Sequence, residues 1–131
     1  MPTSALEGSV DKYVQEWDYA RDGGAIGSIN FRGPKVPNGF RVTSTFIEVL
    51  TGLTGGTNAE IALTMNTAGD LKASAVLTAY ASAGVVAGIP VGTAATAVKA
   101  TAARTITLDV SVAALTAGKL RLVHYGYHTS K

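Results

Sequence analysis

The stretch TLDVSVAALTAGKLRLVHYGY, residues 107–127, decides the fold class. Its first half continues an alternation that begins at residue 105, with apolar side chains on one face of a strand and polar ones on the other. The predicted inward set is Ile106, Leu108, Val110 and Val112. After AALTAG, predicted as a turn with Gly118 at its flexible position, the chain returns with Leu120 and Leu122 inward. The stretch therefore predicts the closing hairpin of an antiparallel sheet with one buried side.

Alternation also recurs near the amino terminus. We predict strands over 13–21 and 26–32, joined by a hairpin at 22–24 (DGG), because glycine adopts the positive φ that hairpin turns require. A helix over 10–21 with Ser9 as its N-cap is the competing interpretation. The aromatic residues and the glycine pair that follows them favour the strand.

The next segments also read as strands between turns. GPKVPNG at 33–39 predicts a turn, since its prolines restrict φ and Asn-Gly closes the reversal. A strand then begins at residue 40, and a bulge divides its apolar residues between two faces. The first face holds Phe40, Val42 and Phe46, and the second holds Ile47 and Val49. A further strand over 59–66 places Ile61, Leu63 and Met65 inward.

The middle of the chain has less pattern. Asp70 is a good N-cap and predicts a short helix over 70–78. Glycines and a proline interrupt residues 80–98, which predicts a long loop with at most short strands. Together the runs give about seven or eight short strands, the pattern of an all-β antiparallel sandwich, and we expect it to be jelly-roll-like. We expect one sandwich domain over 13–131, behind an N-terminal arm over 1–12.

Composition limits the class of protein. The 131 residues are enough for one domain with its own core, and the absence of cysteine excludes disulfides and thiolate metal sites. The start shows no signal-peptide pattern and no run suggests a membrane span, so we expect a soluble protein made in a cytoplasm. Ala, Thr and Gly supply 52 residues and aromatics only nine, and such a thin core favours an oligomer.

Charge is uneven along the chain. Residues 1–24 carry five acidic and two basic side chains, a net charge of −3, which leaves +5 for the rest of a chain whose total is +2. An acidic arm could dock on a basic neighbour or lie in solvent, and both interpretations stay open. The total is too small to indicate binding to nucleic acid.

No pattern of residues predicts catalysis, a metal site or a cofactor site. His124 and His128 lie about 13 Å apart if they share one strand, which is too far for one ion, and we expect both at the surface of a strand end. No nucleophile elbow occurs, and the glycine-rich segment 52–57 lacks the lysine of a phosphate loop.

Three of the nine aromatic residues gather in the acidic segment near the amino terminus. Either Trp17 folds back onto the sandwich core, or this segment docks on another chain, because aromatics are favoured at interface centres. The sequence leaves both open. The residues that we predict to contact other subunits or a capsid are Tyr13, Trp17, Tyr19, Arg21, Tyr125 and Tyr127.

Four stretches carry a resemblance to a known family. They are WDYARDGGAIGSINFRGPKVPNGFRVTSTFIEV (17–49), AEIALTMNTAGDL (59–71), GIPVGTAATAVKATAARTITL (88–108) and AALTAGKLRLVHYGY (113–127). With them the chain resembles, over roughly residues 15–127, a family of small structural proteins encoded by tailed bacteriophages and prophages. These motifs form turns and strands and contain no catalytic residue.

The resemblance implies a non-enzymatic virion component, a capsid decoration (cement) protein on the outer shell. It implies a homo-oligomer, with a trimer favoured, that binds the major capsid protein and reinforces contacts between its subunits. From the composition and the lack of motifs, we expect no cofactor, and neither a membrane nor a nucleic acid as a partner. The alternative is a head-fibre or tail-tip module that binds ligands on the host surface. The loop predicted at 80–98 has one Tyr and no charge, which disfavours sugar recognition.

Overall fold

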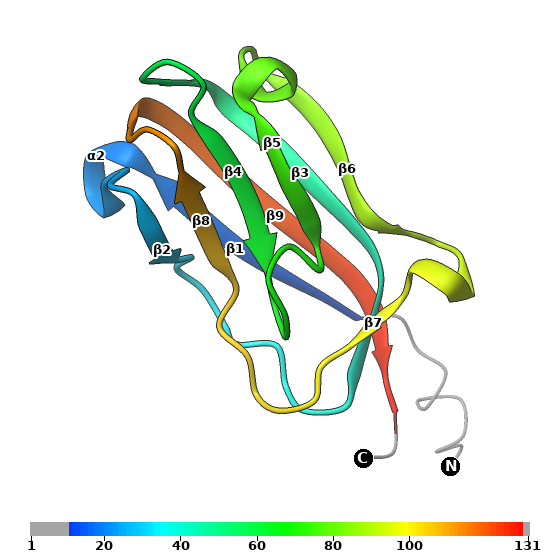
Figure 1. Ribbon diagram of the computed structural model, residues 1–131. Coiled ribbons are helices and arrows are strands. Elements are labelled where there is room, and N and C mark those ends of the chain that lie inside the picture. The colour runs from blue at the N-terminus through cyan, green and yellow to red at the C-terminus, as the bar shows by residue number, and fades with distance from the viewer. Residues whose placement is uncertain (1–10, 130–131) are drawn as a thin grey trace.

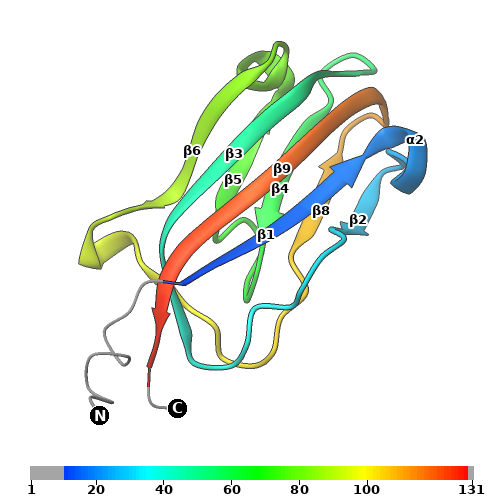
Figure 2. The same cartoon turned by 180° about the vertical axis from the view of Figure 1, so that it is seen from behind.

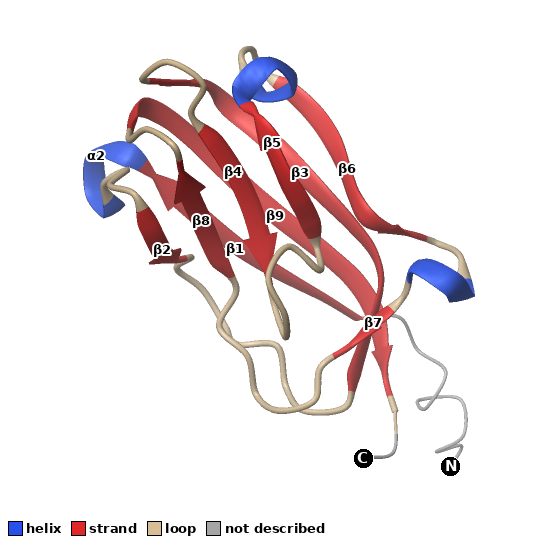
Figure 3. Ribbon diagram, in the orientation of Figure 1, coloured by secondary structure: helices blue, strands red, loops and turns tan. Residues whose placement is uncertain are grey.

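Two antiparallel sheets packed face to face form the molecule (Figure 1 and Figure 3). The structure is a computed structural model, and it describes residues 11–129. The first sheet, called sheet A, has the strand order β1-β9-β3-β6, with the short β7 paired to β3. The second, called sheet B, has the order β2-β8-β4-β5. The all-β antiparallel sandwich predicted from the sequence is confirmed.

The strands have these bounds. Sheet A contains β1 (Asp11–Asp18), β3 (Phe40–Gly55), β6 (Gly84–Val91), β7 (Val98–Lys99) and β9 (Leu115–His128). Sheet B contains β2 (Gly27–Asn30), β4 (Glu60–Thr64), β5 (Lys72–Val76) and β8 (Thr107–Ser111). Three short helical turns are α2 (Tyr19–Asp22), η1 (Leu77–Tyr80) and η2 (Ala94–Thr96). Within residues 11–129 the helical turns have only three or four residues each, so none of them could span a membrane.

The strand pairs are nested. β1 pairs with β9, β2 with β8, β3 with β6, and β4 with β5. The chain therefore changes sheet at nearly every connection, and only the turn between β4 and β5 is a hairpin within sheet B. Two predicted hairpins are wrong for this reason, because β1 and β2 lie in different sheets, and so do β8 and β9.

The connection at 22–24 shows how this happens. One helical turn follows β1, and the Asp18 side chain caps it by accepting from Ala20 N at 3.1 Å. Gly23 ends the turn at φ 80°, and the chain then crosses to sheet B. The glycines do permit a reversal, but they do not choose the strand with which the next segment pairs.

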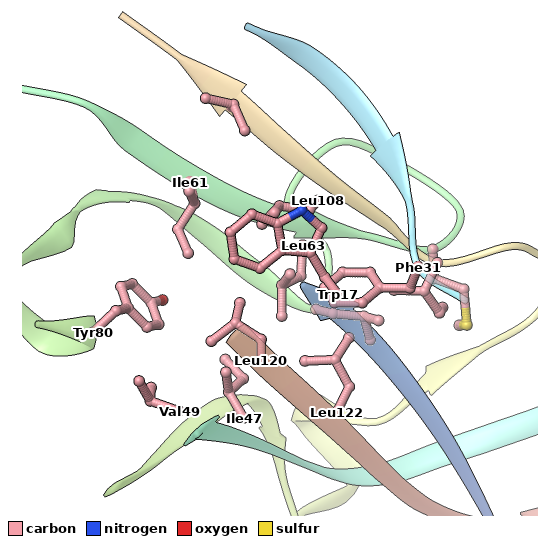
Figure 4. Packing of buried hydrophobic residues seen from close by; sticks show 14 of the residues in the cluster. Trp17, Phe31, Ile47, Val49, Ile61, Leu63, Tyr80, Leu108, Leu120 and Leu122 are labelled. Atoms are coloured by element: carbon pink, nitrogen blue, oxygen red, sulfur yellow. The ribbon is translucent and has the colours of Figure 1, made fainter. Parts of the chain in front are cut away.

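The core between the sheets holds the apolar faces of both (Figure 4). Three predicted inward sets are confirmed as buried, namely Ile61, Leu63 and Met65, then Ile106, Leu108 and Val110, then Leu120 and Leu122. Val112 is the exception, since it is 61% exposed at φ 71°, in the connection that leaves β8 after Ser111. Gly118 lies inside β9 and not in a turn, and a Cβ there would meet the Leu53 side chain.

A bulge in β3 sets which residues face the core. The register with β9 shifts between Val42 and Ser44, so the inward positions change from even to odd numbers. Ile47 and Val49 are therefore buried on the same face as Val42, whereas Phe46 is 41% exposed on the outer face. The bulge was predicted, but the assignment of Phe46 to the face of Phe40 was wrong, because that assignment ignored the residue that the bulge adds.

Residues 70–98 differ most from the prediction. The helix over 70–78 is wrong, because β5 occupies Lys72–Val76. The Asp70 carboxylate instead closes the turn before β5 by accepting from Met65 N at 2.7 Å and Asn66 N at 2.8 Å. The long loop over 80–98 is also wrong, since it contains the eight-residue strand β6. Gly88 fits there because a Cβ would lie 2.9 Å from Thr45 Cβ on β3.

The predicted N-terminal arm falls mostly outside the described residues. Its residues 1–10 are not described, and Asp11 and Lys12 belong to β1.

Candidate functional surfaces

The two histidines have opposite surroundings. His124 is fully buried, and its Nδ1 lies 3.0 Å from Thr45 Oγ1 while Nε2 has no partner. Burial lowers the pKa of His124 to about 4, so the ring is neutral at pH 7. His128 is exposed at the end of β9, with Nε2 3.1 Å from Asp11 Oδ2. The prediction that both histidines lie at the surface is wrong for His124, which continues the inward phase of β9.

A carboxylate lies in a hollow on the outer face of sheet B. Ser28 Oγ donates to Asp109 at 2.7 Å, Thr107 Oγ1 donates at 3.1 Å, and Thr64 Oγ1 donates to its other oxygen. The hollow, of about 490 Å³, is lined by alanine, glycine, serine and threonine around Asp109. A hydroxyl nucleophile needs a base beside it, and both histidines lie on β9 in the other sheet. The hydrogen bonds to Asp109 instead connect the side chains of β2, β4 and β8.

No group of three or more His, Asp or Glu side chains within residues 11–129 could hold a metal ion.

Trp17 lies in the core and is not an external anchor. Its side chain is fully buried among residues of both sheets (Figure 4). Its Nε1 donates to the Gly23 carbonyl at 2.8 Å. The interpretation in which Trp17 folds back onto the core is the correct one, and its prediction as a contact residue is wrong. Gln15 and Trp17 are two residues apart on β1 and share its inner face. The strand period of two therefore places Trp17 in the core.

The other predicted contact residues do not form one patch. Tyr13 is half-buried, and its ring packs edge-on against Phe40 with centroids 4.8 Å apart. Burial and the nearby Asp11 raise the pKa of Tyr13. Tyr19 and Arg21 are exposed on α2, beyond the end of β1 where Asp18 pairs with Lys119. The remaining two, Tyr125 and Tyr127, lie near the far end of β9, on the outer face of sheet A.

An apolar row that the sequence analysis missed crosses sheet A on its outer face. The strand pairings place Val14, Val123, Phe46 and Ala87 side by side on β1, β9, β3 and β6. Val85 is 65% exposed beside this row, and the Tyr125 ring meets the Phe46 ring edge-on at 6.0 Å. We call these six residues the apolar band. One signal in the sequence could have found it, since residues 73–98 contain no charged side chain.

Charged rows border the apolar band on both sides. Toward the α2 end, Arg121 lies 3.2 Å from Glu16 and 3.9 Å from Glu48, which gives this row a net charge of −1. Toward the other end, Lys12 on β1 pairs with Tyr125, and Arg41 on β3 pairs with Tyr127. The outer face of sheet A is therefore apolar in the middle, acidic at one side and basic at the other.

Comparisons with known proteins find similarity in structure only. No protein-family model matches the chain, and no curated protein matches it. A chain in the acidic stable capsid structure of Helicobacter pylori bacteriophage KHP30 is 12% identical, with a TM-score of 0.64 over 95% of this chain and 92% of that one. A chain in the cyanophage Pam1 capsid asymmetric unit is 14% identical, with a TM-score of 0.65 over 95% and 88%.

A chain in the capsid of Ralstonia phage GP4 gives the same result, with 17% identity and a TM-score of 0.62 over 95% of this chain and 88% of that one. At these identities the likeness shows a shared fold. Because each alignment covers most of both chains, the sandwich makes up nearly the whole of these capsid chains too.

Proposed function

We propose that this chain is a non-enzymatic structural protein of a tailed-phage virion and that it decorates the capsid. One observation carries the proposal, which is the shared fold over nearly the full length of chains in three phage capsids. The resemblance of the four sequence stretches to small phage structural proteins points the same way. The partner in this proposal is the major capsid protein, and the location is the outer surface of the shell.

The nested strand pairs support a jelly-roll interpretation of the sandwich. If the two-residue β7 is left aside, the chain enters the two sheets in the order A, B, A, B, B, A, B, A. A long hairpin wound around itself gives this order, and jelly rolls occur in viral capsid domains.

Decoration would act through mass action. Each copy that binds an assembled shell, and not separated subunits, lowers the free energy of the assembled state relative to the separated one. Many weak contacts on one shell add up because neighbouring sites are held close together. Tyr19 and Arg21 are exposed on α2 and are therefore accessible for such binding.

Copy number in purified virions tests the proposal most directly. Quantitative mass spectrometry against the major capsid protein should find hundreds of copies per particle, and a handful of copies would contradict decoration.

Isolated protein should also bind shells that lack it and raise their melting temperature. Unchanged shell stability at full occupancy would contradict the cementing role.

Variants of the exposed residues define the contact. The double variant Tyr19→Ala with Arg21→Ala should reduce shell occupancy, and Ile26→Ala, also exposed and nearby in the chain, is the matched control. Deletion of residues 1–10 leaves β1 intact and removes only Glu7 of the five acidic side chains, whereas a deletion to residue 22 would remove Trp17 from the core. Undiminished occupancy after deletion of 1–10 would exclude a role for those ten residues.

One observation favours the fibre or tail-tip alternative, namely the hollow on sheet B in which hydroxyls surround the Asp109 carboxylate. Its hydroxyls and carboxylate are groups that sugars could bond. A glycan-array signal that Asp109→Asn abolishes, together with a low copy number, would favour this function over decoration.

A further inference from the structure

The edge strand β6 has no charged side chain of its own. Soluble proteins guard such edges with charged side chains, but β6 exposes Val85, Ile89 and Val91 and comes from the uncharged run 73–98. Its free edge is already partly covered, because Ile89 N donates to Leu71 O at 2.8 Å and Lys72 Nζ donates to Ala87 O at 3.2 Å. A partner would therefore pack on the face of the sheet and would not extend it by another strand.

The apolar band continues from this edge across all four long strands of sheet A. Figure 2 shows this face open, with no described segment lying over it. Exposed apolar surface that is continuous and bordered by charges is typical of a protein interface. The pattern of residues on the two sides of the band identifies its partner.

Residues of opposite charge, or both apolar, flank the central row at equal distances. This row consists of Val14, Val123, Phe46 and Ala87. On β1, Glu16 lies two residues to one side of the row and Lys12 two residues to the other. On β6, Val85 and Ile89 flank Ala87 in the same way. A second copy turned by a two-fold axis along this row would bring Glu16 against Lys12 of that copy, and Val85 against its Ile89.

We propose that two copies of this chain associate face to face through the outer faces of their A sheets, about a two-fold axis along this row. Such an interface is isologous, so each contact occurs twice. The apolar band provides the buried centre and the charged rows provide the rim. This association is independent of the proposed capsid function.

A threefold arrangement uses this face differently. Its contacts are heterologous, so the outer face of sheet A on one copy would meet a different surface of the next copy. The self-complementary placement of Glu16 and Lys12 therefore fits a two-fold pair and not the trimer that the family resemblance implies.

Sedimentation equilibrium of the purified full chain tests the proposal. A concentration-dependent equilibrium between monomer and dimer is expected. Phe46→Lys should raise the dimer dissociation constant at least about tenfold, because Phe46 is 41% exposed on the central row and a lysine there would bury a charge in the centre of the interface. Ile26→Lys is the matched control, since Ile26 is 60% exposed and lies outside sheet A, and it should leave the constant unchanged. A chain that stays monomeric at all concentrations overturns the proposal.

A charge exchange then tests the two-fold arrangement itself. Lys12→Glu should weaken the dimer, and adding Glu16→Lys in the same chain should restore it, because the exchanged residues meet again across the axis. Thermal melts confirm that each variant is folded. A trimer, or a double variant weaker than Lys12→Glu alone, overturns the two-fold geometry.

Discussion

The two edges of sheet A use their side chains in opposite ways. β1, at one edge, carries Trp17, and it turns this side chain into the core. β6, at the other edge, carries only small and aliphatic side chains, and it leaves Val85 and Val91 in solvent. The aromatic segment that looks like a binding surface in the sequence is therefore largely structural, and the segment that looks like a loop supplies exposed apolar surface.

The comparison shows that strand phase, and not residue type, decides which side chains are available to a partner. On a strand, neighbouring positions point to opposite faces, so a shift of one residue exchanges core and surface.

Trp17→Ala should lower the free energy of unfolding by about 3–5 kcal/mol, because it opens a large cavity in the core. It also removes the hydrogen bond from Nε1 to Gly23 O. Urea unfolding followed by circular dichroism measures the change. Tyr19→Ala, at a residue 38% exposed, is the control and should change stability by about 0.5 kcal/mol or less. Equal effects of the two substitutions would contradict the assignment of β1 to the core.

His124 lies on β9, the neighbour of β1, and its burial should make the free energy of unfolding depend on pH. Since burial lowers its pKa to about 4 from an unfolded value near 6.5, the unfolded chain takes up a proton first as pH falls. The stability that depends on a neutral His124 is fully present above pH 6.5. As the pH falls to about 4, the free energy of unfolding should decrease by about 3 kcal/mol. Urea unfolding from pH 7 to pH 4 should show a shallower pH dependence for His124→Gln than for the native chain.

The control for that experiment is His128→Gln, at the exposed end of the same strand. It should keep the native pH dependence. Identical slopes for His124→Gln and the native chain would show that His124 is not the buried group responsible.

The phase that the bulge sets in β3 gives a sharper test, because it places the adjacent residues Phe46 and Ile47 on opposite faces. Ile47→Val should cost about 0.5–1.5 kcal/mol, since Ile47 is fully buried. Phe46→Leu, on the outer face, should stay within about 0.5 kcal/mol. Paired urea denaturation curves measure both, and a larger loss at Phe46 would mean that the bulge lies elsewhere.

Val85→Ser on β6 should have the smallest effect on folding. The side chain is 65% exposed, so the free energy of unfolding of the monomer should change by no more than about 0.5 kcal/mol. Dilute protein, at concentrations where it is monomeric, is the sample for this measurement. A loss of several kcal/mol would place Val85 in the core and remove the contrast between the edges.

Much of the fold could be predicted because several strands alternate regularly. The sets around Ile61, Leu108 and Leu120 are buried as predicted. Asp70 was misassigned because an aspartate that accepts backbone N–H groups suits a helix start and a tight turn equally well. The two hairpin predictions were wrong because turn residues indicate that the chain reverses, but they do not indicate which sheet the next strand joins.

The candidate surfaces were less predictable. Of the six predicted contact residues, Trp17 proved to be buried, and the other five are spread over both ends of sheet A and stay predictions. The apolar band draws residues from β1, β3, β6 and β9, which are far apart in the chain and meet only through strand pairing.

Local period and composition were enough to predict the all-β class, the inward phase of the regular strands and the absence of disulfide bonds. The tertiary structure alone decided the strand partners, the side of the bulge on which Phe46 lies and the burial of Trp17 and His124. Those features depend on contacts between residues distant in sequence, and the requirement to bury both sheets in one core selects them. The residues 107–127 predicted the sandwich correctly, but they join its two sheets and do not close a hairpin.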